Sequence, residues 1–167
     1  VEALEEAGFE ITTKSWLSDY EERIEKSETE RFVRMKAEAV ATGDPLMSVF
    51  LRNPQILVDG AELPRFAEKI DDETAVYIIS RISGECADRE ALPGDYFLTE
   101  REKEHLKALV ENYEDVVVVL NAGGVLDTGF YREIEGLSAM IFISQAGVAC
   151  GTVLADVLSG RAVPSGK

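Results

Sequence analysis

The sequence predicts an α/β fold, in which a mostly parallel sheet is sandwiched between helices. Three apolar runs carry this prediction: residues 75–82 (AVYIISRI), 115–122 (DVVVVLNA) and 139–146 (AMIFISQA). Each run is too continuously apolar for a half-exposed strand, and runs rich in Val and Ile are typical of strands covered on both faces. Helical patterns follow each run. This alternation of strand and helix indicates parallel strands joined by right-handed crossovers.

The chain has 167 residues, which suits one domain with a sizeable core, so we expect a single α/β domain over residues 1–167. Residues 1–60 form a helical and irregular lead-in, and residues 61–167 hold the repeated strand–helix units. The opening stretch VEALEEAGFEIT predicts the end of a helix, a stop at Gly8 and a short extended piece.

A long polar stretch then predicts a helix over residues 15–41. Its apolar positions are sparse, so we expect it to lie on the surface or to be broken midway. Gly43-Asp44-Pro45 and later turn signals predict irregular structure over residues 42–60. AELPRFAEKI predicts a short helix around residues 62–70.

The helix between the first two strands has a clear start. Thr99 and Glu102 have the spacing of a capping box, in which each side chain accepts a backbone N–H of the other residue. His105 lies among charged neighbours, so we expect it to be a solvated helix residue. Four apolar side chains are expected on one face: Leu106, Leu109, Val110 and Tyr113. Further helices are predicted near residues 131–137 and 148–160.

Charge and composition exclude several classes of function. The 32 acidic and 17 basic residues give a net charge of −15, which argues against nucleic acid or an anionic membrane as a partner. The apolar runs are shorter than the ~20 residues that cross a bilayer. One histidine and two cysteines do not make a zinc site, a Ser-His-Asp triad or a disulfide framework. Two unpaired cysteines favour a cytoplasmic location.

Glycine-bearing loops follow all three strands: SGECADR, NAGGVLD and SQAGVACG. In an open parallel sheet, ligands bind beyond the carboxyl ends of the strands. Glu85 in the first loop is therefore a candidate general acid/base, or an exposed loop residue with no chemical role. Asp88 and Arg89 either bind a polar ligand or pair with each other and so order the loop.

Other candidate chemistry is weaker. Gly123-Gly124 follows a strand, but neither a G-x-G-x-x-G pattern nor a P-loop lysine accompanies it. Cys86 and Cys150 have no histidine nearby in sequence and are better read as small structural thiols. Retaining glycoside hydrolysis needs two carboxylates about 5–5.5 Å apart. Outside the loop that carries Glu85, the one acid in a strand-end loop is Asp127, and it is too far along that loop to be a convincing partner.

Four motifs in order resemble the C-terminal domain of family 3 glycoside hydrolases, most closely those of the bacterial β-glucosidase type. They are SRISGECADRE, PGDYFLTEREKEHLKAL, VVVVLNAGGVLDT and ADVLSGRAVPSGK. The resemblance runs from about Ala75 to Lys167, and EAGFEIT near the start of the chain is a weaker match. It implies an α/β sandwich domain that shares its active site with a preceding (β/α)8-type barrel.

The resemblance implies that this chain is a fragment of a retaining β-glycosidase that removes a terminal sugar from a β-linked glucoside or oligosaccharide. The barrel would carry the nucleophilic Asp and is absent from the chain, since a barrel alone needs about 250 residues. Glu85 matches the family's acid/base glutamate in an SGEGADR-like loop. No metal or organic cofactor is expected. An edge strand of the family domain is expected to be missing, so we expect self-association of the isolated, inactive fragment.

Four further loop residues match family positions and are carried over as loop-ordering or sugar-contacting groups: Arg81, Ser83, Asp88 and Arg89. Two departures affect the prediction. Cys86 replaces the usual Gly after the acid/base, and QAGVACG replaces a pattern closer to QPGQEGG. These departures leave open an alternative, a non-catalytic carbohydrate-binding or assembly module with the same fold.

Overall fold

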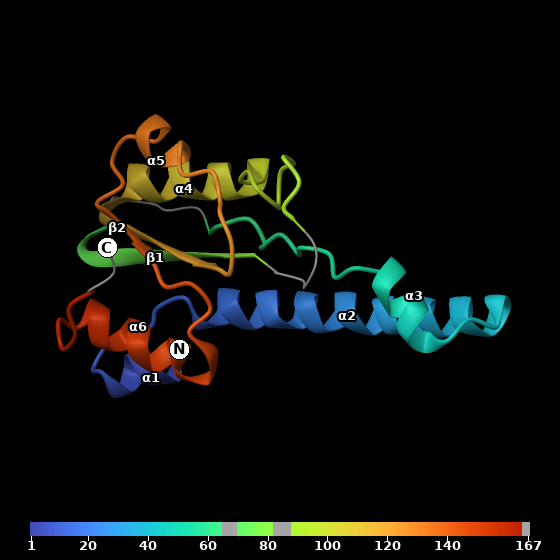
Figure 1. Ribbon diagram of the computed structural model, residues 1–167. Helices are drawn as coiled ribbons and strands as arrows, with labels where there is room; N and C mark the ends of the chain where they lie inside the picture. The colour runs from blue at the N-terminus through green and yellow to red at the C-terminus, as the bar shows by residue number, and fades with distance from the viewer. Residues whose placement is uncertain (65–69, 82–87, 165–167) are drawn as a thin grey trace. The chain divides into compact units, whose positions relative to one another are not determined.

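A computed structural model describes residues 1–64, 70–81 and 88–164 (Figure 1). The chain divides into two compact units. One consists of Val1–Thr13 together with Leu63–Lys167, and holds the sheet; the other is Lys14–Glu62. The expected helix at 62–70 falls largely outside the described residues.

The sheet has three parallel strands in the order β1-β2-β3: β1 (Ile70–Arg81), β2 (Tyr113–Ala122) and β3 (Ala139–Phe142). This confirms the predicted α/β class. β1 begins earlier than expected, and β3 ends at Phe142, four residues before the end of its apolar run. Ser144 follows with a positive φ of 53°, a conformation that an extended strand does not contain. The third strand-end loop therefore begins earlier than the sequence suggests.

Helix α4 (Glu100–Asn112) connects β1 to β2 and covers one face of the sheet (Figure 1). Both bonds of the predicted capping box are present, because the Thr99 side chain accepts from the Glu102 N–H and the Glu102 side chain accepts from the Thr99 N–H. The buried core beneath α4 contains Ile79, Leu98, Leu106, Val118, Leu120, Phe130 and Ile134. The prediction of this helix and its start is confirmed.

The prediction for His105 is wrong. This side chain is only 3% exposed, and its Nδ1 lies 2.9 Å from the Tyr77 hydroxyl of β1. The buried positions of α4 are 102, 105, 106 and 109, which the helical period places on one face. The charged residues next to His105 in sequence point away from this face of the helix, so they do not indicate whether His105 is exposed.

The opposite side of the sheet holds α1 (Glu2–Glu6) and α6 (Cys150–Leu158), which pack against each other where Gly151 meets Ala3 (Figure 1). β2 is covered on both faces, as expected. β1 is not: Val76 and Ile78 are 37% and 50% exposed, whereas the alternate positions face α4. For this strand, the prediction of two covered faces is wrong, because β1 lies at an edge of the described sheet.

Two shorter elements complete the sheet unit. The predicted helix near 131–137 is a single turn, α5 (Phe130–Glu133), and a short 3-10 turn over Gly147–Ala149 precedes α6. Gly8 has a φ of 97°, which fits its predicted role in ending the first helix.

Among the described residues, no helix has the length and apolar character needed to span a membrane.

The second unit contains α2 (Lys14–Thr42) and α3 (Leu46–Arg52). α2 is one continuous helix, close to the predicted bounds. α3 lies in a stretch that we expected to be irregular, and that prediction is wrong. The turn signals mark only the connection, whereas LMSVFLR contains no helix breaker. Burial of Met35 and Val49, and a bond from Arg31 Nε to the Asn53 carbonyl, stabilise the pair of helices.

Candidate functional site

Arg81 is the last residue of β1 and is buried, with 3% of its surface exposed. It forms a two-bond ion pair with Glu102 in the first turn of α4. Nη1 lies 2.7 Å from Oε1, and Nη2 lies 2.6 Å from Oε2. A parallel pair of charge-assisted bonds fixes both distance and orientation. The carboxyl end of β1 is therefore bound to the start of α4.

Three carbonyl oxygens occupy the remaining donors of Arg81. Nε donates to Asp95 at 3.1 Å, Nη1 to Ser80 at 2.9 Å and Nη2 to Phe97 at 3.3 Å. A guanidinium has five N–H groups, and each of them now has a protein acceptor. This arrangement favours the loop-ordering alternative for Arg81 over contact with a sugar.

Arg89 is the last residue of the first strand-end loop, SGECADR, and also bonds to Asp95. Its Nη1 lies 2.7 Å from Asp95 Oδ1, and its side chain is 11% exposed. Asp88 is exposed, and the ion pair described for Arg89 is with Asp95.

The loop after β2 approaches the same guanidinium. A Cβ atom added to Gly124 would lie 3.4 Å from Arg89 Nε. The backbone of this loop therefore comes into van der Waals range of Arg89 with no side chain between them. This contact supports the expectation that the loops at the carboxyl ends of β1 and β2 come together.

Asp95 bonds to Arg81, which precedes the first loop, and to Arg89 and Glu90 at the far end of that loop. Its carbonyl accepts from Arg81, and its carboxylate accepts from Arg89 and, at 2.7 Å, from the Glu90 N–H. We call these four residues the Asp95 cluster. Partial burial acts to raise the pKa of Asp95. The bonds from Glu90 and Arg89, with the charges of Arg89 and Arg81, outweigh that effect and lower the pKa below its ordinary value.

Glu85, Ser83 and Cys86 lie in residues 82–87, outside the described residues. The structure therefore describes three of the five predicted site residues. It brings Arg81 and Arg89 together through Asp95 and leaves Asp88 at the surface.

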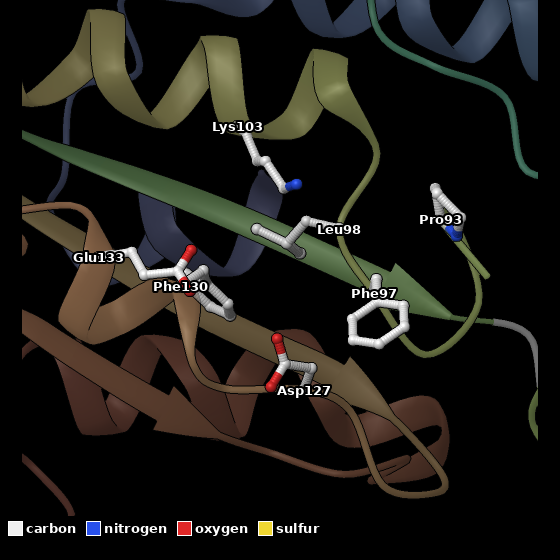
Figure 2. A pocket seen from close by; sticks show the side chains of 7 residues that line it. All are labelled: Pro93, Phe97, Leu98, Lys103, Asp127, Phe130 and Glu133. Atoms are coloured by element: carbon white, nitrogen blue, oxygen red, sulfur yellow. The ribbon is translucent and has the colours of Figure 1, made fainter. Parts of the chain in front are cut away.

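A pocket of about 300 Å³ lies beside the Asp95 cluster, between the segment 93–98, α4 and the loop after β2. Figure 2 shows the side chains that line it: Pro93, Phe97, Leu98, Lys103, Asp127, Phe130 and Glu133.

The charged groups around this pocket raise the pKa of Lys103. The largest contribution is the bond from Lys103 to Glu100. Desolvation acts in the opposite direction, and the negative charges of Glu100, Glu133 and Asp127 raise the pKa further.

Asp127 has a structural role in this pocket. Its Oδ1 accepts the Gly129 N–H at 3.1 Å, and its own N–H donates to the Tyr96 carbonyl at 2.9 Å. These bonds connect the loop after β2 with the segment that carries Asp95. Across the ranges that the structure describes, no group of three or more His, Cys, Asp or Glu side chains is arranged to hold a metal ion.

Sequence reasoning missed Asp95 and the second role of Glu102. In the sequence, Pro93-Gly94-Asp95 is noted only as part of a family motif, and Glu102 is predicted only as a capping residue. One signal was available. Arg81 ends an apolar run, and an arginine that such a run buries needs a carboxylate partner. Glu102 is a carboxylate that the capping box already places in the first turn of α4, the helix that follows β1.

Comparisons with known proteins agree with this architecture. The family model for the glycosyl hydrolase family 3 C-terminal domain matches residues 12–167. The chain is 37% identical over 110 residues to a β-glucosidase of Ruminococcus albus, and 33% identical over 117 residues to β-glucosidase A of Butyrivibrio fibrisolvens. These matches cover 66% and 57% of this chain, but only 11% and 14% of those proteins.

A solved β-glucosidase from Paenibacillus barengoltzii shares the fold. It superposes with a TM-score of 0.53 and 34% identity, covering 56% of this chain and 10% of that one. The parallel sheet with its helices thus resembles the fold of a part of that larger protein.

Proposed function

Because the chain belongs to the family of glycosyl hydrolase family 3 C-terminal domains, we propose that it supplies the general acid/base to a retaining β-glycosidase. Glu85 is the proposed acid/base. The likeness to proteins named β-glucosidases supports the class of reaction. The place of Glu85 in the sequence supports its role, because residues 82–87 follow directly after β1, and ligands of open parallel sheets bind beyond the carboxyl ends of the strands.

The observation that carries the proposal is the support around the Glu85 loop. Residues on both of its sides bond to Asp95, and the glycine loop after β2 approaches Arg89. An acid/base must be held within hydrogen-bond reach of the oxygen that it protonates. Arg81 and Arg89, which flank residues 82–87, both have such bonds to Asp95, and this supports the proposal.

In the proposed mechanism, an Asp of a barrel domain in the parent protein attacks the anomeric carbon and forms a glycosyl-enzyme. Glu85 donates its proton to the oxygen of the leaving group. In the second step, the Glu85 carboxylate takes a proton from the water that attacks the same carbon, which returns the enzyme to its starting state. The chemistry needs neither a metal nor an organic cofactor. The proposed substrate is a terminal β-linked glucose.

The test uses the full-length protein and Glu85→Ala. Two β-glucosides are compared, a dinitrophenyl glucoside with a good leaving group and an alkyl glucoside with a poor one. Loss of a general acid should lower kcat/KM for the alkyl glucoside by about 10²–10⁴-fold and affect the first step of the dinitrophenyl glucoside far less. Added azide should restore turnover of the dinitrophenyl glucoside and yield a β-glycosyl azide.

Glu104→Ala is the matched control. Glu104 lies on the exposed side of α4, with a side chain that is 64% exposed. This variant should leave both substrates unchanged. Equal and small losses for Glu85→Ala on the two substrates, without an azide product, would contradict the proposed role. A full-length protein that binds glucosides but turns none over would select the non-catalytic module instead.

A further inference from the structure

The pocket between the segment 93–98, α4 and the loop after β2 has a buried apolar base. Leu98 and Phe130 line it, and each is only 3% exposed. Phe97 also lines it but is 37% exposed, so part of its ring is open to solvent. The ring packs edge-to-face on Tyr96, with the ring centroids 4.9 Å apart. An aromatic ring that is held by a neighbour and partly open to solvent offers a ligand an apolar surface.

Backbone bonds hold the walls of this pocket together. The Phe97 carbonyl accepts from Arg81 Nη2 at 3.3 Å, and the Tyr96 carbonyl accepts from the Asp127 N–H at 2.9 Å. The segment 93–98 is thereby bonded both to the end of β1 and to the loop after β2. That loop follows the carboxyl end of a parallel strand, where ligands of open parallel sheets bind. The pocket is therefore preformed at the edge of the sheet that suits a ligand.

Three charged side chains also line the pocket: Lys103 of α4, Asp127 of the loop after β2 and Glu133 of α5 (Figure 2). Lys103 Nζ donates to Glu100 at 2.8 Å. An ammonium group has three N–H donors, and this bond uses one of them. Asp127 accepts the Gly129 N–H through Oδ1, and a carboxylate has about four acceptor positions. The pocket therefore offers a ligand both donors and acceptors.

These groups narrow the chemical class of the ligand. A purely apolar ligand would remove Lys103, Asp127 and Glu133 from water without replacing their hydrogen bonds, which is costly. An anion would meet the two carboxylates, and a cation would meet the Lys103 ammonium group. Hydroxyl groups both donate and accept, so a neutral polyol can bond to all three side chains. A pyranose ring adds C–H groups that can cover the exposed part of Phe97.

We propose that the pocket lined by Phe97, Lys103, Asp127 and Glu133 binds one neutral pyranose ring of a β-linked glucoside. The choice of a glucoside rests on the proposed function. The C–H groups of the ring pack on Phe97, and its hydroxyls accept from Lys103 and donate to Asp127 and Glu133. The volume of about 300 Å³ is at the lower end of the range for small-molecule sites, which suits one ring better than several.

The first experiment measures binding of methyl β-glucoside to the 167-residue chain by ligand-observed NMR at low protein concentration. The wild-type chain should show saturable binding. Lys103→Met keeps the apolar part of the side chain and removes its donors, so the dissociation constant should rise by about 10-fold. Lys107→Met is the matched control, because Lys107 is an exposed lysine of the same helix that does not line the pocket. This change should leave the affinity unaltered.

A second pair of variants tests the aromatic side of the pocket. Phe97→Leu keeps an apolar side chain but removes the flat ring, so the dissociation constant should rise by about 3–10-fold. Phe142→Leu makes the same change on β3, at a residue that is 58% exposed and does not line the pocket, and should have no effect. Circular dichroism checks that each protein is folded. Absence of saturable binding to the folded wild-type chain, or unchanged affinity in Lys103→Met and Phe97→Leu, would overturn the proposal.

Charged sugars test the proposed class of ligand. Methyl β-glucuronide and methyl β-glucosaminide have a pyranose ring that carries an anionic or a cationic group. Both should bind more weakly than methyl β-glucoside, because each brings a charge toward a like charge in the pocket. Tighter binding of either one would show that the pocket selects a charge, and a neutral sugar would then be the wrong ligand.

The proposed function and this inference fail in different ways. The kinetics of Glu85→Ala test the acid/base in the full-length protein, whereas binding to the chain requires no turnover. If Glu85→Ala depends on the leaving group and the chain binds no sugar, the acid/base assignment stands and the pocket proposal is wrong. If the chain binds the glucoside through Lys103 and Phe97 and Glu85→Ala shows no such dependence, the pocket stands and the acid/base assignment is wrong.

Discussion

Arg81 and Glu102, 21 residues apart in sequence, form a two-bond ion pair in which the Arg81 side chain is 1% exposed and that of Glu102 is 11% exposed. Glu102 Oε2 also accepts the Thr99 N–H at 2.8 Å. The Glu102 carboxylate therefore takes part in the N-terminal capping box of α4 and also neutralises the buried charge of Arg81 at the end of β1. The start of the helix and the end of the strand are coupled through this side chain.

The first prediction follows from this coupling. Glu102→Gln keeps an oxygen that can accept the Thr99 N–H but leaves the Arg81 charge buried without its counter-ion. Removing one partner of a buried pair costs about 3–5 kcal/mol, so we expect the free energy of unfolding to fall by about 3 kcal/mol in urea titrations of the chain. Glu104→Gln removes one partner of the exposed Arg101–Glu104 pair and should cost less than about 1 kcal/mol. Equal losses in the free energy of unfolding for Glu102→Gln and Glu104→Gln would contradict the prediction that the buried ion pair contributes more than the exposed one.

The second prediction concerns the capping box alone. Thr99→Ala removes the side-chain oxygen that accepts the Glu102 N–H at 3.1 Å. Loss of an N-cap of this kind costs about 1 kcal/mol. Thr99→Ser keeps the hydroxyl and should stay close to wild type. Urea titrations of the three proteins give the comparison, and a Thr99→Ser loss as large as that of Thr99→Ala would point to the methyl group instead.

Local patterns predicted the parts of the fold that depend on local physics. The capping box, the α4 helix and the three strands were readable because each depends on residues a few positions apart. His105 was misread for a related reason. Its charged sequence neighbours suggest an exposed residue, but the helical period places His105 on the buried face of α4 with Glu102 and Leu109.

The contacts that build the candidate site were not readable in this way. Arg81 meets Glu102 because α4 begins at the edge of the sheet where β1 ends. Arg89 approaches Gly124 because the parallel strands β1 and β2 end at that same edge. The turn that carries Asp95 was visible in the sequence, but its two arginine partners were not. The family motifs nominated Arg81 and Arg89, and the structure supplied the residue that joins them.

The third prediction tests the buried Tyr77–His105 bond, which links β1 to α4 at 2.9 Å. Tyr77→Phe keeps the ring and removes the hydroxyl. A buried hydrogen bond contributes about 1 kcal/mol, and a buried partner left without one adds to the cost. We expect a loss of about 1–2 kcal/mol in urea unfolding. Tyr131→Phe, in another tyrosine packed against the same core, should lose less, and the reverse order would contradict the prediction.

The fourth prediction concerns pH and Asp95. Its pKa is lowered in the folded protein, so folding is favoured by the ionised carboxylate. This contribution is present above the unfolded pKa of about 3.9 and is lost as pH falls through the folded value. The difference in free energy of unfolding between wild type and Asp95→Asn should therefore narrow as pH falls below about 4. A difference that stays constant from neutral pH to about pH 3 would show that the carboxylate charge contributes nothing.

The fifth prediction concerns the exposed edge of the sheet. β1 lies at one end of the described strand order, with Val76 and Ile78 exposed on its outer face. Unpaired strand edges with apolar side chains bind other strands. We therefore predict that the isolated chain associates with a second copy through β1, and that light scattering detects a larger species as concentration rises.

Charge gives this prediction a second test. At a net charge of −15, two copies repel each other, so association should strengthen as salt screens the repulsion. Ile78→Lys should weaken association, because it places a charge on the apolar face of the edge strand. Val163→Lys makes the same change at a residue that is 85% exposed and outside the strands, and it should have a much smaller effect. A chain that remains monomeric at every concentration and salt level would rule out the association, since the apolar edge would then be too small to overcome the repulsion between copies.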